Sequence, residues 1–148
     1  MSEAVVRAPG EGQVRLGAIT LKVGAADTDG ALTVAEYVVP PNWGGPPPHI
    51  HETAEWFLVV EGDLMFSVNG QPVDGKAGTF VFVPGGVPHG FSNPGDTPAK
   101  MYFFLMPGGF ENYFAELEDA LEGKFPPDAE TAARVIPPLM AKYGVRTA

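Results

Sequence analysis

Three histidines and one glutamate are the residues of this chain whose types and spacing best suit metal chemistry. His49 and His51 form a His-x-His pair, Glu55 follows four residues later, and His89 is the third and last histidine. Side chains alternate between the two faces of an extended strand, so His49 and His51 would point the same way. Glu55 stays on that face if the strand continues through a small irregularity at Thr53-Ala54, and His89 must arrive from elsewhere in the fold. Three imidazoles and a carboxylate favour a first-row divalent ion: Fe, Mn, Co, Ni, Cu or Zn.

A shared metal site has to be weighed against ordinary roles for these residues. A histidine is usually a hydrogen-bonded or surface residue, and a glutamate beside it is often a solvated charge. Here all three histidines fall in two short, strand-like segments bounded by proline and glycine. Because the sequence contains no cysteine, a metal would bind through nitrogen and oxygen alone. The distribution favours one site for one divalent transition metal per chain.

Length and composition indicate a single globular domain. The chain has 148 residues, of which 45% are hydrophobic and 18% charged, and no apolar run approaches the roughly 20 residues that span a bilayer. The first residues lack the basic and then hydrophobic pattern of a secretory signal, so we expect a cytoplasmic protein. The absence of cysteine excludes disulfides and fits a reducing compartment.

The formal net charge of −9 excludes several classes of partner. Nucleic-acid binding needs clustered Lys and Arg, and an acidic surface is repelled by anionic lipids, so we expect neither nucleic acid nor membrane as a partner. A small molecule remains the expected ligand. Small open barrels commonly cover an edge strand by pairing, which makes a homodimer the expected oligomer.

The first two thirds of the chain are cut by glycine and proline into short, alternating or Val/Phe/Tyr-rich segments, which predicts a β-sandwich or barrel. Asn69-Gly70 between two such segments predicts a hairpin with a type I′ turn. Alternation also predicts that Trp56, next to Glu55, points away from the metal. The expected strands are 14–19, 20–23, 32–39, 49–51, 56–61, 63–68, 80–83, 90–92 and 99–105.

Helices are expected after residue 107. Apolar residues recur at helical spacing up to a helix end near Gly123, and Asp128 can cap a second helix that runs towards Val135. Pro137-Pro138 can then start a further turn that ends at Tyr143-Gly144. We expect these helices to pack outside the sheet, with their apolar stripe serving as core or dimer contact. The residues of the first stripe are Phe110, Phe114, Leu117 and Leu121.

Two motifs in the sequence resemble those of the cupin superfamily. The first is His49-Ile50-His51, three residues, Glu55, six residues and Gly62; the second is Gly78, five residues, Pro84-Gly85-Gly86, two residues, His89, three residues and Asn93. Fifteen residues separate the motifs, as in small microbial cupins. One departure is Trp43, which stands where the first motif usually begins with glycine.

The resemblance implies an all-β fold, a cupin-type jelly-roll barrel with a short C-terminal helical extension. The single cupin domain would span residues 1–148, with a barrel core at about 13–107 and a helical tail at about 108–148. His49, His51, Glu55 and His89 would be the metal ligands. The whole chain looks like single-domain cupins labelled quercetin 2,3-dioxygenase-like.

The resemblance also implies a reaction at an open metal site. In a quercetinase-like dioxygenase the metal would bind a deprotonated enol or hydroxyl of an aromatic substrate, and Glu55 would also accept that proton as the catalytic residue. An apolar wall around the substrate ring could come from Tyr37, Phe57, Phe66, Phe82, Phe91 and Phe103.

Two other functions remain open at this point. The first is a Lewis-acid isomerase or polyketide-cyclase-type cupin, in which a second base would act; Glu36, Glu52 and Lys100 are the candidates. The second is a non-catalytic cupin that binds or senses a small molecule. It would show saturable binding without turnover.

Overall fold

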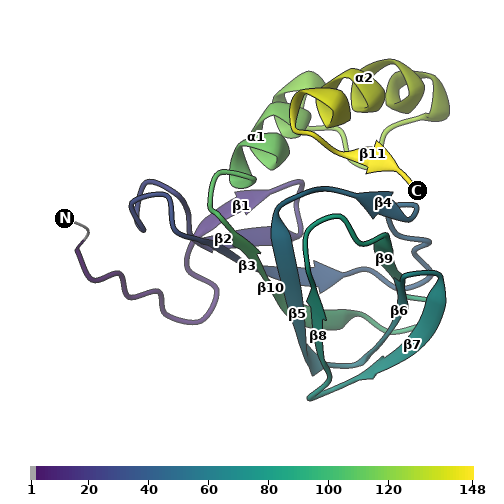
Figure 1. Ribbon diagram of the computed structural model, residues 1–148, viewed down its shortest axis with the longest axis horizontal. Helices are drawn as coiled ribbons and strands as arrows, with labels where there is room; N and C mark the ends of the chain where they lie inside the picture. Colours follow the sequence, from purple (N-terminus) through teal and green to yellow (C-terminus); the bar gives the residue numbers. More distant parts are fainter. Residues whose placement is uncertain (1–2) are drawn as a thin grey trace.

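Two antiparallel sheets face each other in the computed structural model, which describes residues 3–148 (Figure 1). One sheet has six strands in the order β1 (Gln13–Arg15), β2 (Ile19–Val23), β3 (Thr33–Val39), β10 (Ala99–Met106), β5 (Ala54–Glu61) and β8 (Phe80–Val83). The other has five, in the order β11 (Arg146–Thr147), β4 (His49–Ile50), β9 (His89–Ser92), β6 (Asp63–Val68) and β7 (Gln71–Lys76). The predicted jelly-roll architecture with C-terminal helices is confirmed.

The core lies between the sheets and consists of every second residue of the facing strands. On β10 every second residue is buried, from Ala99 to Leu105, and Met101 is fully inaccessible. Phe57 and Val59 of the neighbouring β5 point to the same side and are also buried. Phe66 of β6 approaches Phe57 from the opposite sheet, with ring centroids 5.3 Å apart. This packing sets the distance between the sheets.

Turns follow the sequence signals closely. Asn69 and Gly70 join β6 to β7 with φ of 50° and 77°, the two positive values that a type I′ turn requires. The predicted strand 14–19 is shorter than expected, because β1 ends at Arg15 and Leu16 adopts a φ of 52° in the turn before β2.

The chain changes sheets between His51 and Glu55. β4 ends at Ile50 in the five-stranded sheet, and β5 begins at Ala54 in the six-stranded one. The spacing suggested that Glu55 lies on a continuation of the histidine strand, but it lies on a strand of the other sheet. It is brought back to the histidines because its side chain points inward from the facing sheet.

Two helices, α1 (Glu111–Ala120) and α2 (Ala129–Lys142), lie across one end of the sandwich (Figure 1). Asp128 caps α2, with its Oδ1 accepting a hydrogen bond of 2.8 Å from the Thr131 amide. The expected break at Pro137-Pro138 does not occur, and α2 runs through both prolines. Packing of the apolar residues around them, Ile136 and Met140, outweighs the two missing amide donors.

The last strand, β11, was not expected from the sequence. It pairs with β4, which places Thr147 opposite His49. The Ala148 amide extends the pairing by donating to the Pro48 carbonyl over 3.0 Å. The end of the chain therefore holds the strand that carries the first histidine. Across residues 3–148, no helix is long and apolar enough to cross a membrane.

Candidate metal centre and its cavity

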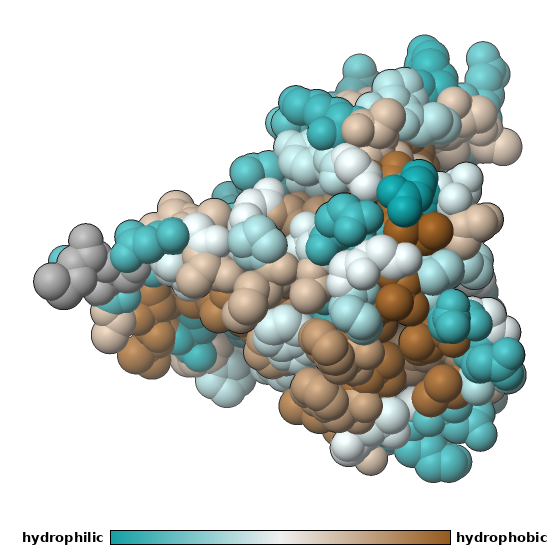
Figure 2. Space-filling view, in the orientation of Figure 1, coloured by the Kyte–Doolittle hydropathy of each residue, from teal (hydrophilic) through white to brown (hydrophobic). Residues whose placement is uncertain are grey.

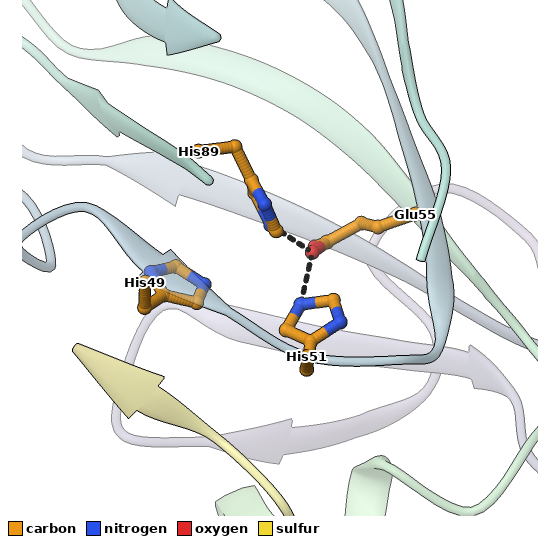
Figure 3. A group of neighbouring side chains, drawn as sticks. All are labelled: His49, His51, Glu55 and His89. Carbon is orange, nitrogen blue, oxygen red and sulfur yellow. Dashed lines mark hydrogen bonds and ion pairs between the residues drawn. The ribbon is translucent and has the colours of Figure 1, made fainter. Parts of the chain in front are cut away.

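Four side chains from three segments converge between the two sheets (Figure 3). His49 on β4 lies in register with His89 on β9, His51 follows β4 directly, and Glu55 reaches across from β5. One ligand atom from each residue lies within 4.8 Å of every other. His51, Glu55 and His89 are buried, with 3%, 8% and 2% of their surfaces exposed, and His49 is partly buried.

Backbone carbonyls orient all three imidazoles. The Nδ1 atoms of His49, His51 and His89 lie 3.0, 2.8 and 2.9 Å from the carbonyl oxygens of Pro47, Thr53 and Val87. Because a carbonyl only accepts, each Nδ1 must carry the proton. In a neutral imidazole each Nε2 then has a free lone pair, which is the form that binds a metal.

The centre of the cluster brings acceptors together. The Nε2 atoms of His51 and His89 each lie 3.0 Å from the same Glu55 oxygen, Oε2 (Figure 3). An unprotonated imidazole nitrogen and a carboxylate oxygen repel each other unless a cation lies between them. Either a proton on an imidazole or a metal ion satisfies this arrangement.

Electrostatics at the cluster favour charge separation between Glu55 and the histidines. Burial alone would raise the pKa of Glu55, but hydrogen bonds from His51 and His89 hold the pKa below its usual value. Burial lowers the pKa of His49. For His89 the effect of burial is outweighed by Glu55, which raises the pKa of the imidazole. A divalent cation that displaces the proton from these imidazoles would supply the positive charge that the buried Glu55 carboxylate needs.

The donor set and its spacing fit a transition metal. Ligand atoms that share an ion at about 2.1 Å lie roughly 3 to 4 Å apart, depending on the angle between them. The two 3.0 Å contacts already match that range, and the widest separation of 4.8 Å requires only a small contraction. These four residues could therefore hold one ion with little movement of the backbone.

A cavity of about 490 Å³ adjoins the cluster and separates the barrel from the helices. Its polar end is formed by His49, His51 and Glu55. Tyr37, Trp43, Phe91 and Phe103 line it from the barrel, together with Leu16, Ile19 and residues 45–47, and the opposite wall comes from the helical tail. The tail contributes Phe110, Tyr113, Phe114, Leu117, Phe125, Pro126, Pro127, Ala132, Ile136, Pro137 and Met140.

The Tyr37 hydroxyl in this wall has no hydrogen-bond partner in the part of the chain that the structure describes. Tyr37 is 4% exposed and packs edge-on against Trp43 and Phe91, with centroids 5.8 and 5.9 Å away. No hydrogen bond to its hydroxyl is found among residues 3–148, yet no fully inaccessible side-chain oxygen there lacks a partner. The hydroxyl must therefore reach accessible space, which the cavity supplies.

Residues 35–105 match a family model, the Cupin domain. The chain contains a cupin domain. It is similar to an RmlC-like cupin from Shewanella frigidimarina NCIMB 400, with a TM-score of 0.60 and 19% identity over 75% of this chain and 96% of that one. It is also similar to the polyketide cyclase RemF from Streptomyces resistomycificus, with a TM-score of 0.59 and 24% identity over 72% and 80% of the two chains.

A third similar structure is salicylate 1,2-dioxygenase from Pseudaminobacter salicylatoxidans, at 28% identity and a TM-score of 0.49 over 51% of this chain. The chain spans 22% of the length of that dioxygenase. No curated protein matches the sequence. The similarities to solved structures therefore bear on the fold of this cupin, and its chemistry has to be argued from its own residues.

The six aromatic residues predicted to surround the substrate fall into three different environments. Tyr37, Phe91 and Phe103 line the cavity of the cupin. Phe57 and Phe66 do not line it but pack together in the core beyond His89. Phe82 points outward, 55% exposed, because it alternates with the buried Val81 and Val83. Trp56 is on that outer side too, as alternation predicted.

The cavity contains residues that sequence reasoning did not assign to it. Trp43 occupies the motif position where other cupins usually have glycine, and its side chain lines the cavity. The core role predicted for the helical stripe is confirmed in part, because Phe110 and Phe114 pack against the core and Leu117 is buried, but these three residues also line the cavity. The signals for this role were the departure at Trp43 and the Phe125-Pro126-Pro127 segment, which is too apolar for an ordinary surface loop.

Proposed function

We propose that this cupin binds one divalent transition metal through His49, His51, Glu55 and His89 and acts as a quercetinase-like dioxygenase on a small aromatic or enolisable molecule. The observation that carries the proposal is the cavity of about 490 Å³ that joins this donor set to an apolar, aromatic wall. A volume of this size accommodates a ligand of two or three rings. Four protein ligands leave positions on a six-coordinate ion for a substrate.

The chain's own residues would orient and deprotonate the substrate. Glu55, whose pKa is held low, is ionised at neutral pH and can accept a proton from an enol or hydroxyl at the polar end of the cavity. Trp43, Phe91 and Phe103 would hold the ring and exclude water. A bound redox-active metal would supply the electron transfer that dioxygen chemistry requires.

Tyr37 would fix the other end of the substrate. Tyr37 pairs with Met101 and Glu55 pairs with Leu105 on the opposite side of β10, so their Cα atoms are two strands and four residues apart. Strand geometry converts this offset to about 16 Å between Cα atoms. The proposed substrate therefore has an acidic oxygen at one end and a hydrogen-bond acceptor at the other.

A Lewis-acid isomerase or cyclase is the second candidate, and the placement of possible bases weighs against it. Glu36 and Lys100 point to the outer side of the six-stranded sheet, and Glu52 is exposed beside Arg146. Glu55 is the one carboxylate that lines the cavity within residues 3–148. A cyclase of this kind would have to use Glu55 alone or a phenol such as Tyr113.

Metal analysis followed by oxygen consumption tests the proposal. We expect natively purified protein to carry close to one Fe, Mn, Co, Ni or Cu per chain, and the loaded protein to consume dioxygen with a flavonol or a related enolisable aromatic. The variant His51→Ala/His89→Ala is the control for site-bound metal. Full metal content in this variant would refute the site. Product formation without oxygen uptake would favour the cyclase, and saturable binding without turnover would favour a sensor.

A further inference from the structure

The strand that carries the first histidine of the candidate metal centre is very short. β4 consists of His49 and Ile50 alone, and on one side it pairs with β9 through a single register pair, His49 with His89. The segment before it, residues 46–48, is Pro-Pro-Pro, and proline has no amide to donate to a neighbouring strand. The position of His49 therefore depends on what holds the other side of β4.

That other side is held by β11, which lies beside β4 below His49 in the view of Figure 3. The Ala148 amide donates a hydrogen bond of 3.0 Å to the Pro48 carbonyl. Hydrogen-bonded pairs recur at every second residue of an antiparallel ladder, so Arg146 and Ile50, which lie opposite each other, form the next bonded pair. β11 therefore binds the residue before His49 and the residue after it.

β11 is itself fixed to the end of α2. Val145, the residue before the strand, is 8% exposed, and its amide donates a hydrogen bond of 2.9 Å to the Met140 carbonyl. Gly144 adopts a φ of 68° in the turn between helix and strand, a conformation that favours glycine. A strand that starts from such a fixed point can hold β4 in a defined position.

Backbone hydrogen bonds attach β11 to the sheet, because both of its residues are exposed. Figure 2 shows hydrophobic residues gathered over β5 and β8, whereas the surface over β4 and β11 mixes hydrophilic and hydrophobic residues. The ion pair of Arg146 with Glu52, at 3.8 Å, joins two exposed side chains and contributes little. The Arg146 amide is therefore the group whose removal should release β4.

The other two histidines have supports that do not involve β11. The His51 carbonyl accepts a hydrogen bond of 2.9 Å from the Gly86 amide, and His51 and His89 are 3% and 2% exposed. Both also contact Glu55 through Nε2 at 3.0 Å. His49 is only partly buried. A shift of β4 would therefore move His49 more than the other ligands.

We propose that β11 positions His49 as a metal ligand, so that the pairing of Arg146 with Ile50 tightens metal binding. The inference rests on the proposed function, since it requires an ion at the four-residue cluster. Groups that orient a metal ligand are worth about 10 to 100-fold in metal affinity. The effect is reciprocal, because thermodynamic linkage requires the metal to stabilise the pairing of β11 by the same factor.

Titration of the full chain with Co²⁺, in competition with a chelator, tests the proposal. Arg146→Pro removes the paired amide, and we expect it to weaken Co²⁺ binding about tenfold. Thr147→Pro is the matched control, because β11 is at the edge of its sheet and the Thr147 amide points to the open side, where proline is tolerated. Arg146→Ala keeps the amide and loses the ion pair with Glu52. Both controls should bind Co²⁺ as the natural chain does.

A double-mutant cycle separates positioning from general destabilisation. In His49→Ala the ligand that β11 holds is absent, so the addition of Arg146→Pro should change the Co²⁺ affinity by less than about twofold. The visible spectrum of Co²⁺ bound to Arg146→Pro should shift towards that of His49→Ala, because both lose an imidazole from the ion. Equal losses on the two backgrounds, or equal affinities of Arg146→Pro and Thr147→Pro, would overturn this inference alone. A natural chain that binds no Co²⁺ would overturn the metal site as well.

Amide hydrogen exchange of the natural chain covers the case in which Arg146→Pro fails to fold. Saturation with Co²⁺ should slow exchange of the Arg146 amide about tenfold, the factor that linkage requires. The amides of β7, at the opposite edge of the five-stranded sheet, are the control and should exchange at an unchanged rate. Equal slowing at both edges, or no slowing at Arg146, would contradict the role of β11.

Discussion

The cavity has a floor and a roof that differ in how they are built. The floor is the four-residue cluster of His49, His51, Glu55 and His89, held by strand pairing and by backbone carbonyls at all three Nδ1 atoms. The roof consists of α1, α2 and the loop between them. No residue of α2 is fully buried, although the helix spans 14 residues. The floor is fixed by strand register and backbone hydrogen bonds, and the roof by apolar contacts around the cavity and by hydrogen bonds at the start of α1.

This difference predicts which part of the protein opens most easily. Within α1 and α2, Leu117 alone is buried. Segments with few buried contacts open most easily. The roof is attached mainly through α1, where the Glu111 carboxylate accepts hydrogen bonds from the Ala25 amide at 2.5 Å, the Gly109 amide at 2.8 Å and the Thr33 hydroxyl. We infer that the floor determines metal binding and the roof determines stability and ligand selection.

The largest effect is expected in the floor. His51→Ala/His89→Ala removes both nitrogens that face Glu55 Oε2, and metal content should fall from near one per chain to near zero in elemental analysis. Loss of a single hydrogen bond that supports a metal ligand lowers metal affinity about 10 to 100-fold, and loss of two ligands should lower the affinity further. The matched control is Glu52→Gln, an exposed carboxylate one residue from His51, which should retain its metal.

Leu117→Ala tests the roof. Leu117 is 5% exposed on α1 and lines the cavity. Its truncation should lower the free energy of unfolding by about 2 to 5 kcal/mol in a denaturant titration. Metal content should stay near one per chain. Leu121→Ala, at a buried residue that does not line the cavity, should cost a similar amount without weakening ligand binding. Loss of metal in Leu117→Ala would mean that the floor depends on the roof.

The floor was predictable from the sequence and the roof was not, for a physical reason. His49, His51 and His89 are rare residues in short motifs, and pairing of adjacent strands brings them together. The one error there concerned the path to Glu55, because nothing local distinguishes a bulge from a change of sheet. The roof stripe has the same helical period whether it covers a core or a cavity. Its partner surface is more than 60 residues away in sequence at Tyr37 and Trp43, so only the folded chain shows what it covers.

Attachment of the roof should depend on pH. Burial would raise the pKa of Glu111, but the Thr33 hydroxyl and the amides of Ala25 and Gly109 lower it below its usual value. A carboxyl with a lowered pKa in the folded state stabilises above its unfolded pKa, and this contribution is lost as pH falls through the folded value. Thermal melts should therefore show Glu111→Gln to be less stable at neutral pH, by about 1 to 3 kcal/mol.

The same variant should be less sensitive to acid than the natural chain, so the two melting temperatures should converge below about pH 4. Asp119→Asn is the matched control, because Asp119 is an exposed carboxylate on the same helix. Its substitution should leave both the neutral stability and the acid limb unchanged. If the difference in melting temperature between Glu111→Gln and the natural chain stays constant down to acid pH, the Glu111 carboxylate does not help to attach the roof.

The smallest effect is expected at Tyr37, which lines the barrel side of the cavity away from the floor. Its hydroxyl has no partner in residues 3–148, so Tyr37→Phe should change the free energy of unfolding by less than about 0.5 kcal/mol. Burial raises the pKa of Tyr37 to about 12, so the phenol remains a hydrogen-bond donor throughout the neutral range. Loss of one such donor should weaken binding of an aromatic ligand by about 3 to 10-fold in calorimetry. Tyr102→Phe removes a hydroxyl from the outer face and should leave the affinity unchanged. If both variants bind equally well, the ligand does not extend from the floor to Tyr37, and the cavity selects by shape alone.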